Sequence, residues 1–301
     1  MLKRIVSLDK VSKYYGAFAA VDSLDLAVNS GEIVGIIGHN GAGKTTTLKM
    51  SVGLIAPTSG RITIMGEDIQ KNGLKVKKGL GYLPEENALY ENMTALEYLA
   101  FFADIYGIPR KEAVRRGGEL LDSLKLDAGK KFIGEMSKGM KRKVSIARTL
   151  IHDPDLLILD EPNSGLDPLT SFFIIDYLKK LREKGKTIIL SAHNLFHVEY
   201  ICDRVAIIKR GRLVVYDSME NIRRSLGRRE FEIVFKTSEE LNYPRRDGNY
   251  CFKTPAIEEM AALLRKILDN NWALIDLAIR QSALEDIYLD IMNDDKQMEL
   301  K

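Results

Sequence analysis

One short glycine-rich segment constrains the fold of this 301-residue chain more than any other. Residues 38–45 read Gly-His-Asn-Gly-Ala-Gly-Lys-Thr, which matches the pattern G-x-x-x-x-G-K-[ST] at every fixed position. The apolar run 31–37 before it predicts a buried strand, and a helical pattern starts at Lys44 and ends near Gly53. This strand–loop–helix context predicts an α/β protein that binds phosphate.

The residue types of this loop suit a nucleotide ligand. Glycines let the backbone curl so that successive N–H groups face one point, and the helix N-terminus adds partial positive charge. We expect Lys44 to reach the β- and γ-phosphates and the Thr45 hydroxyl to bind Mg²⁺. His39 occupies a variable position and is interpreted as an exposed loop residue. The expected nucleotide-binding residues of the loop are Gly38, Asn40, Gly41, Ala42, Gly43, Lys44, Thr45 and Thr46.

A second apolar strand pattern, 156–159, ends in the two acids Asp160 and Glu161. A carboxylate at the tip of a strand can hold Mg²⁺, which is the role expected for Asp160. Glu161 follows directly and is expected to polarise the attacking water as a general base. His193 follows a third strand pattern, 187–190, where a neutral imidazole can donate to phosphate and position that water. We therefore expect Glu161, His193 and Lys44 to be the catalytic residues.

The remaining patterns outline two domains. Strands that alternate with helices, one of them at 174–183, predict a mostly parallel sheet covered on both faces, and residues 2–28 predict antiparallel strands. Residues from about 86 to 150 look helical, with a capping box at Thr94 and Glu97. After Gly227, strand patterns restart and 11 basic residues stand against 15 acidic ones. We expect an ATPase domain at 1–226 and a small α+β accessory domain at 227–301.

The composition excludes several function classes. The net charge of +3 gives no reason to expect a nucleic-acid partner. Because no run of about eighteen apolar residues and no secretory signal is present, nothing is expected to span a membrane. Cys202 and Cys251 form no C-x-x-C pair, so neither a disulfide framework nor a zinc site is indicated. We expect a cytoplasmic protein that can reach a membrane only by docking to another protein.

Five motifs in order resemble those of the ATP-binding subunits of ABC transporters, over roughly residues 3–225. Residues 136–140, Met-Ser-Lys-Gly-Met, resemble the signature loop of that family, and residues 164–167 resemble its D-loop. Residues 82–85, Tyr-Leu-Pro-Glu, resemble the Q-loop. Tyr15 resembles the aromatic residue that stacks on adenine, although the adjacent Tyr14 leaves a packing role open. The resemblance implies a phosphate-loop NTPase core of ABC type, with an antiparallel β subdomain and a helical subdomain.

The resemblance also implies a mechanism with two chains. Ser137 and Gly139, at a helix N-terminus, would bind the γ-phosphate of ATP held by a second subunit, and Asp167 would couple the two sites. The chain would act as a homodimer, or as a heterodimer with a similar ATPase, on the inner face of the cell membrane. A separate transmembrane permease would dock beside the helical segment. Candidate residues for that docking are Glu86, Leu89, Tyr90 and Phe101, with a core position also open for Phe101.

Two departures from the family pattern favour export. Lys138 and Met140 replace a Gly and a Gln of the signature loop, and Glu85 replaces the usual Gln of the Q-loop. Both sequence variants resemble those found in a subgroup of bacterial exporters for drugs, sodium, lipids or polysaccharides. Glu85 can still bind Mg²⁺ as a carboxylate. Lys138 could add positive charge to the anion site or point to solvent.

The main alternative is a soluble ABC ATPase that acts on nucleic acid or the ribosome. Three basic groups, at 75–78, 110–116 and 141–143, could suggest RNA, but a solvated face or anionic lipid headgroups explain them as well. Such ATPases usually carry two ATPase units in one chain or a long coiled coil, and this sequence has neither. A non-hydrolysing nucleotide sensor is a third class, which the presence of Glu161 and His193 argues against.

Overall fold

The computed structural model describes residues 3–86, 88–127 and 129–298. They divide between Met219 and Glu220 into two compact units, here called unit 1 and unit 2. The helix α8 (Met219–Leu226) therefore lies at this division, whereas the sequence pattern placed the domain boundary after it. The division into an ATPase domain and an accessory domain remains a prediction.

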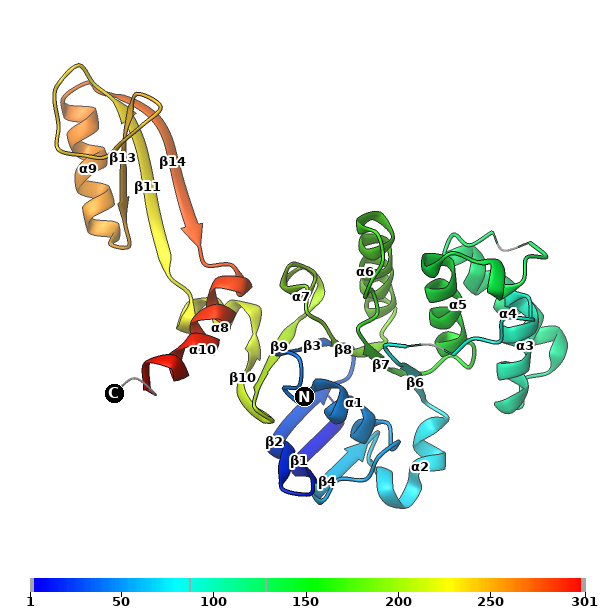
Figure 1. The fold of residues 1–301 in the computed structure, drawn as a ribbon. Coiled ribbons are helices and arrows are strands. Elements are labelled where there is room, and N and C mark those ends of the chain that lie inside the picture. Colours follow the sequence, from blue (N-terminus) through cyan, green and yellow to red (C-terminus); the bar gives the residue numbers. More distant parts are fainter. Residues whose placement is uncertain (1–2, 87, 128, 299–301) are drawn as a thin grey trace. The chain divides into compact units, whose positions relative to one another are not determined.

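Unit 1 contains two sheets (Figure 1). One is four-stranded and antiparallel, in the order β2-β1-β4-β5, and includes the antiparallel strands predicted at residues 2–28. The other is six-stranded, in the order β10-β9-β3-β8-β7-β6, and is parallel except for the edge strand β10. The strands are β1 (Arg4–Tyr15), β2 (Phe18–Asn29), β3 (Ile33–Ile37), β4 (Ser59–Ile64), β5 (Glu67–Asp68), β6 (Leu80–Leu83), β7 (Leu156–Asp160), β8 (Thr187–Ser191), β9 (Arg204–Lys209) and β10 (Arg212–Ser218).

The central strands are apolar at almost every position because helices cover both faces of the parallel sheet. Every residue of β3, β7 and β8 is buried. The helix α1 (Lys44–Ser51) contacts both sheets, and α6 (Pro168–Glu183) and α7 (Leu195–Ile201) contact β8 and β3. A Cβ on Gly35 would lie 2.8 Å from the Cys202 sulfur, so the absence of a side chain lets α7 approach the sheet. The predicted covered parallel sheet is confirmed.

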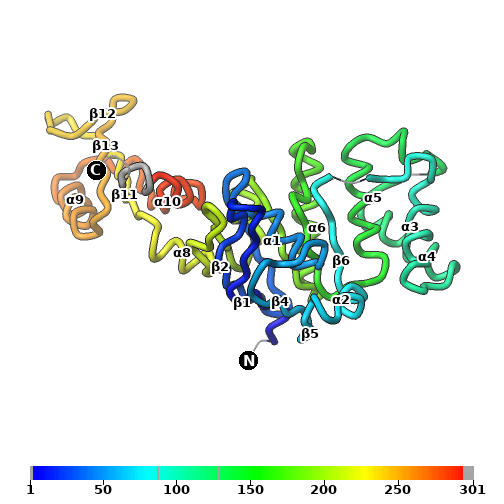
Figure 2. Tube along the Cα trace, turned by 60° about the horizontal axis from the view of Figure 1, so that its bottom comes forward, coloured from blue at the N-terminus to red at the C-terminus, as the bar shows by residue number. Residues whose placement is uncertain are grey.

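Three helices of the central segment pack on one another: α3 (Ala95–Ile105), α4 (Arg110–Ser123) and α5 (Lys138–Leu150). Figures 1 and 2 show them as a group beside β6 and α6. The predicted capping box starts α3, because the Thr94 hydroxyl accepts from the N–H of Glu97 and the Glu97 carboxylate accepts from the N–H of Thr94. These helices form the expected helical subdomain. A further helix, α2 (Ile69–Lys77), precedes β6, and the turn η1 (Ile133–Glu135) precedes α5.

Unit 2 is built on a third sheet, in the order β12-β13-β11-β14 and antiparallel throughout. Its core forms between one face of this sheet and the helix α9, and includes Ile233, Phe235, Leu263, Ile267 and Trp272. The mixture of strands and helices confirms the predicted α+β character. The elements after α8 are β11 (Arg229–Lys236), β12 (Arg245–Arg246), β13 (Asn249–Thr254), α9 (Ile257–Asp269), β14 (Ala273–Gln281) and α10 (Leu284–Met298).

Candidate functional site

The predicted phosphate loop connects β3 to α1, and its glycines are required by its geometry. Gly41 and Gly43 adopt φ values of 80° and 108°, which favour glycine. A Cβ on Gly43 would lie 2.4 Å from the Ala20 carbonyl oxygen, and one on Gly38 equally close to that of Ile208. Any larger residue would therefore push the loop away from its neighbouring strands.

Lys44 is folded back onto the loop that contains it. Its Nζ donates to the carbonyl oxygens of Gly38 at 2.7 Å and His39 at 3.3 Å. Only 7% of the residue is exposed, and burial lowers the pKa of Lys44, against the opposing effect of Glu161 and nearby carboxylates. A buried ammonium held by two carbonyl oxygens is a ready binding partner for phosphate.

Oxygen ligands gather where β7 ends. Asp160 is buried, and its Oδ1 accepts from the Ser191 hydroxyl at 2.5 Å and from the Thr45 hydroxyl at 3.3 Å. Hydroxyl and carboxylate oxygens suit Mg²⁺, which usually takes one or two carboxylates together with water and substrate phosphates. Within the described part of the chain, no cluster of three or more His, Cys, Asp or Glu residues could hold a metal. The donor set therefore fits Mg²⁺ bound together with a triphosphate.

Glu161 is a strained and buried carboxylate. Its backbone adopts φ 46°, its N–H donates to the Ser191 hydroxyl at 2.9 Å, and only 4% of the residue is exposed. Burial raises the pKa of Glu161 to about 7, with Lys44 opposing the shift. His193 Nδ1 lies 2.7 Å from Glu161 Oε1. A carboxylate with a pKa near neutrality can accept a proton under physiological conditions, as a general base must.

Lys44, Thr45, Glu161 and His193 line a cavity of about 430 Å³. The predicted site residues Gly38 and Asp160 do not line it but are hydrogen-bonded to Lys44 and Thr45. Tyr15 lines it and is 52% exposed, whereas the Tyr14 hydroxyl donates to Asp22 at 3.2 Å. Phe18, which the sequence reasoning missed, lines the mouth beside Tyr15 and is 62% exposed. An exposed aromatic pair across the β1–β2 turn was the signal available in the sequence. The lining residues are Tyr15, Phe18, Ala20, His39, Asn40, Gly41, Ala42, Gly43, Lys44, Thr45, Thr46, Glu85, Glu161 and His193.

Three predicted site residues lie elsewhere. Ser137, Gly139 and Asp167 line a separate hollow of about 300 Å³, which shares no lining residue with the first. Ser137 caps α5 by accepting from the N–H of Met140 at 3.2 Å, and Asp167 caps α6 by accepting from the N–H of Thr170 at 2.9 Å. Hydrogen bonds from Thr170 lower the pKa of Asp167. Two helix N-termini thus meet at this hollow, which is suited to an anion and is here called the anion hollow.

The geometry matches a known family. Residues 21–164 match the family model described as ABC transporter. An ABC transporter ATP-binding protein of Methanocaldococcus jannaschii is 35% identical over 290 residues, which cover 96% of this chain and all of that protein.

The chain belongs to the ABC transporter ATP-binding proteins.

It is an ABC ATPase, and further relatives agree. The linearmycin resistance ATP-binding protein of Bacillus subtilis is 38% identical over 224 residues, which cover 74% of this chain and 72% of that protein. A solved ATP-binding subunit of an ABC transporter is 35% identical, with a TM-score of 0.67, covering 73% of this chain and 92% of its own. A dimeric ATP-binding cassette solved after hydrolysis with ADP and Pi is 26% identical, with a TM-score of 0.67 over 71% of this chain and 99% of its own.

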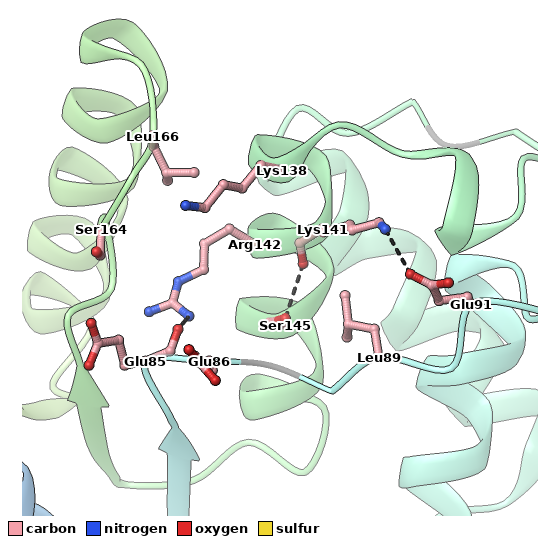
Figure 3. A pocket seen from close by; sticks show the side chains of 10 residues that line it. All are labelled: Glu85, Glu86, Leu89, Glu91, Lys138, Lys141, Arg142, Ser145, Ser164 and Leu166. Carbon is pink, nitrogen blue, oxygen red and sulfur yellow. Dashed lines mark hydrogen bonds and ion pairs between the residues drawn. The ribbon is translucent and has the colours of Figure 1, made fainter.

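Arg142 is a functional candidate that the sequence reasoning left among the scattered basic residues. It lies in α5 of the ABC ATPase and is only 6% exposed (Figure 3). Its guanidinium donates five hydrogen bonds to backbone carbonyl oxygens, and burial lowers the pKa of Arg142 to about 10. The acceptors are Pro84, Glu85, Asp160, Glu161 and Pro162.

The solvated-face interpretation of 141–143 is therefore wrong for Arg142. Its neighbours Lys141 and Lys143 are partly exposed, and Lys141 pairs with Glu91 at 3.1 Å. Arg142 is buried because the ends of β6 and β7 meet α5 at this point. No local sequence signal distinguishes it from its two basic neighbours.

Two of the three residues that depart from the family pattern, Glu85 and Lys138, line more than one of these hollows. Glu85 lines the cavity of about 430 Å³, here called the nucleotide cavity. It also lines a neighbouring hollow of about 480 Å³ beneath α5, which Figure 3 shows. Lys138 extends toward the D-loop, because a Cβ on Gly165 would lie 2.0 Å from its Nζ. Lys138 is exposed and lines both the hollow beneath α5 and the anion hollow of Ser137 and Gly139, and its contribution to anion binding remains a prediction. Within the described residues, no helix of this ABC ATPase is long and apolar enough to cross a membrane.

Proposed function

We propose that two copies of this ABC ATPase close around two ATP molecules and drive export through a separate membrane permease. One observation carries the proposal: the phosphate loop with its base, and the Ser137 hollow, are two separate half-sites within one chain. Each half-site is chemically incomplete, since the first lacks the second anion-binding helix and the second lacks a catalytic base. A second chain supplies the missing half in each case.

Within each composite site the residues divide the work. Lys44 leaves the loop carbonyl oxygens for the phosphates, while the loop N–H groups and the α1 N-terminus stabilise their negative charge. Glu161 takes a proton from the attacking water, and His193, at 2.7 Å, orients the Glu161 carboxylate. Thr45 and Asp160, with Glu85 nearby, would hold Mg²⁺, which when bound neutralises charge on the β- and γ-phosphates.

The opposite chain provides the remaining contacts. The Ser137 hydroxyl, the Gly139 N–H and the N-terminus of α5 would meet the γ-phosphate, with the Lys138 ammonium adding positive charge. Asp167, at the start of α6 in the same hollow, would report the state of one site to the other. Tyr15, and Phe18 beside it, would stack on the adenine.

The permease contact is proposed beside the helical subdomain. Glu86 and Leu89 line the hollow beneath α5, whereas Tyr90 and Phe101 pack edge to face at 5.7 Å between ring centroids and stay about half exposed. Rotation of the two subunits on closure would move a permease helix docked there. The chain would then work in the cytoplasm, at the inner face of the membrane.

Export is supported by the relatives. Two relatives bear names that refer to resistance or to drugs. One is the linearmycin resistance protein, and the other is a probable multidrug ABC transporter ATP-binding protein of Escherichia coli, 34% identical over 73% of this chain and 38% of that protein. A host that carries Glu161→Gln is expected to retain a toxic transported compound longer than its parent. Equal retention in the two strains would contradict export.

Mixing two inactive variants of the chain tests the shared site. Ser137→Arg should block the anion hollow while leaving the phosphate loop intact, so this variant alone should hydrolyse little ATP. Lys44→Ala should disable the phosphate loop and leave the hollow intact, so it too should hydrolyse little ATP alone. At saturating Mg-ATP, a mixture of the two variants is expected to recover activity, because a mixed dimer joins the intact phosphate loop of the Ser137→Arg chain to the intact hollow of the Lys44→Ala chain. A mixture that is no more active than the two separate variants would contradict the shared site.

A further inference from the structure

The strand β14 forms an edge of the unit 2 sheet. Along its length it pairs only with β11, and no other strand in the described residues bonds to its outer side. It contains nine residues, and none of them is fully buried. A long edge with unpaired backbone N–H and C=O groups is a template for another strand.

The exposed surface of β14 is apolar to an unusual degree for a free edge. Four large apolar side chains on this one strand remain between 42% and 62% exposed. Monomeric proteins usually protect an edge with short strands, bulges or charges, and expose few adjacent large apolar groups. The four residues are Leu274, Ile275, Leu277 and Ile279.

The helix α9 explains why part of this surface is uncovered. Leu277 lies opposite Ile233 and Ile279 lies opposite Phe231, so both share the face of the sheet on which α9 packs. The helix, however, contacts β11 and β13 (Figure 1). The apolar face therefore extends beyond the helix, onto the edge strand.

We propose that β14 pairs antiparallel with β14 of a second copy of this chain, about a two-fold axis at Ala278. Edge pairing about an axis perpendicular to the sheet places both α9 helices on the same face and joins the two four-stranded sheets into one. In this register Leu277 of one copy stands opposite Ile279 of the other. The uncovered apolar strips then adjoin one another between the two helices.

The charges on the opposite face select this arrangement. Asp276 and Arg280 are the charged residues of β14, and they stand at equal distances on either side of Ala278. Antiparallel pairing about Ala278 sets Asp276 of each copy opposite Arg280 of the other, a favourable cross-strand pair. A parallel in-register pairing would instead place like charges side by side. Arg280 already pairs with Glu232 at 2.5 Å, which orders its guanidinium on that face.

The consequence is a dimer that needs no nucleotide. The ATP-dependent closure proposed above joins the phosphate loop of one chain to the anion hollow of another, whereas the β14 interface lies in unit 2. It would tether two ATPase units and so raise their effective concentration for closure. The two contacts can be tested separately. The ATP-dependent closure requires Mg-ATP, whereas the β14 contact is expected to persist in a chelator.

The first test uses the full chain without nucleotide, in EDTA, by sedimentation at micromolar concentration. A dimer is expected for the wild type, and a monomer for Leu277→Lys with an unchanged circular dichroism spectrum. Leu289→Lys, which changes an exposed leucine of α10, is the matched control and should remain dimeric. A monomeric wild type, or a Leu277→Lys variant that remains dimeric, would overturn the proposal.

A second test checks the register. Directly opposed residues of antiparallel strands have Cα atoms about 4.5–5.5 Å apart, within the range that a disulfide spans. Ala278→Cys is therefore expected to form a covalent dimer on mild oxidation, because the native Cys202 and Cys251 are both buried. Arg246→Cys, on the opposite edge strand β12, is the control and should form little covalent dimer. Equal cross-linking of the two variants would contradict pairing at β14.

Discussion

The Nη2 atom of Arg142 donates a 2.6 Å hydrogen bond to the backbone carbonyl oxygen of Glu161. The helix that starts at the signature loop is thereby tied to the strand end that presents the proposed base. The same guanidinium bonds the carbonyl oxygen of Glu85 at 3.0 Å. One buried side chain thus fixes the Q-loop, the base and the signature helix relative to one another, without lining the nucleotide cavity.

Arg142 is expected to act as a positioning residue. Arg142→Ala would leave five carbonyl oxygens without this donor and cost about 3 kcal/mol or more of folding stability. In the Arg142→Lys variant, which retains a buried cation, we expect kcat to fall about tenfold while KM for ATP changes less than about threefold. Steady-state ATPase kinetics measure both.

Lys141→Ala is the matched control, because Lys141 forms only a surface pair with Glu91 and such pairs contribute roughly 0–1 kcal/mol. It should retain wild-type kinetics and stability. An Arg142→Lys variant in which KM rises while kcat is unchanged would show that Arg142 serves nucleotide binding instead.

The raised pKa of Glu161 predicts a pH-dependent stability difference. Because the carboxyl binds its proton more tightly in the folded chain, at a pKa of about 7, ionisation of Glu161 destabilises the fold as pH rises from about 4.5 to 7. Glu161→Gln removes this cost. In EDTA without nucleotide, its stability advantage over wild type is expected to grow from about 1 kcal/mol at pH 5 to about 3 kcal/mol at pH 8.

Denaturant unfolding at several pH values measures that advantage. Glu119→Gln makes the same substitution at an exposed carboxylate paired with Arg115 and is measured beside Glu161→Gln as the control. A Glu161→Gln advantage of constant size between pH 5 and pH 8 would mean that Glu161 titrates normally in the folded chain.

Glu85 is expected to strengthen magnesium binding, because a carboxylate stands where the family usually has an uncharged amide. Glu85→Gln should raise the Mg²⁺ concentration for half-maximal ATPase activity about threefold or more, with a smaller change in kcat at saturating Mg²⁺. Glu86→Gln removes a neighbouring charge that does not line the nucleotide cavity, and should leave the Mg²⁺ dependence unchanged. Identical Mg²⁺ curves for wild type and Glu85→Gln would exclude a metal role for Glu85.

Lys138 is expected to contribute positive charge to the anion hollow. Lys138→Glu should weaken ATP-dependent closure about tenfold at low salt, whereas Lys138→Gly, the family's usual residue, should weaken it less. Lys111→Glu makes the same charge change on the exposed surface of α4 and serves as control. Equal affinities for closure in Lys138→Glu and Lys111→Glu would show that only net charge matters.

Much of the nucleotide cavity could be predicted from sequence because its chemistry is local. The phosphate loop, the Asp160–Glu161 strand end and His193 each follow an apolar strand, and parallel strands bring their ends to one edge. The structure places Lys44, Glu161 and His193 around one cavity, as expected. Their catalytic roles remain predictions.

The features that were missed depend on local caps or on tertiary burial. The helix expected at 174–183 starts at Pro168, because Asp167 caps it and a proline fits the first turn; that Asp-Pro pair was the available signal. The short β4, β5 and α2 carry weak patterns. The burial of Arg142 depends on the meeting of β6, β7 and α5, which no window of sequence contains.

The most direct test of the central claim is the mass of a Glu161→Gln, Leu277→Lys double variant, measured by sedimentation with and without Mg-ATP. The first change slows hydrolysis and the second removes the nucleotide-independent contact, so only the shared ATP sites can join the chains. We expect a monomer that becomes a dimer on addition of Mg-ATP, and no such change when Lys44→Ala is added. A variant that binds ATP tightly and remains monomeric would contradict the shared-site account.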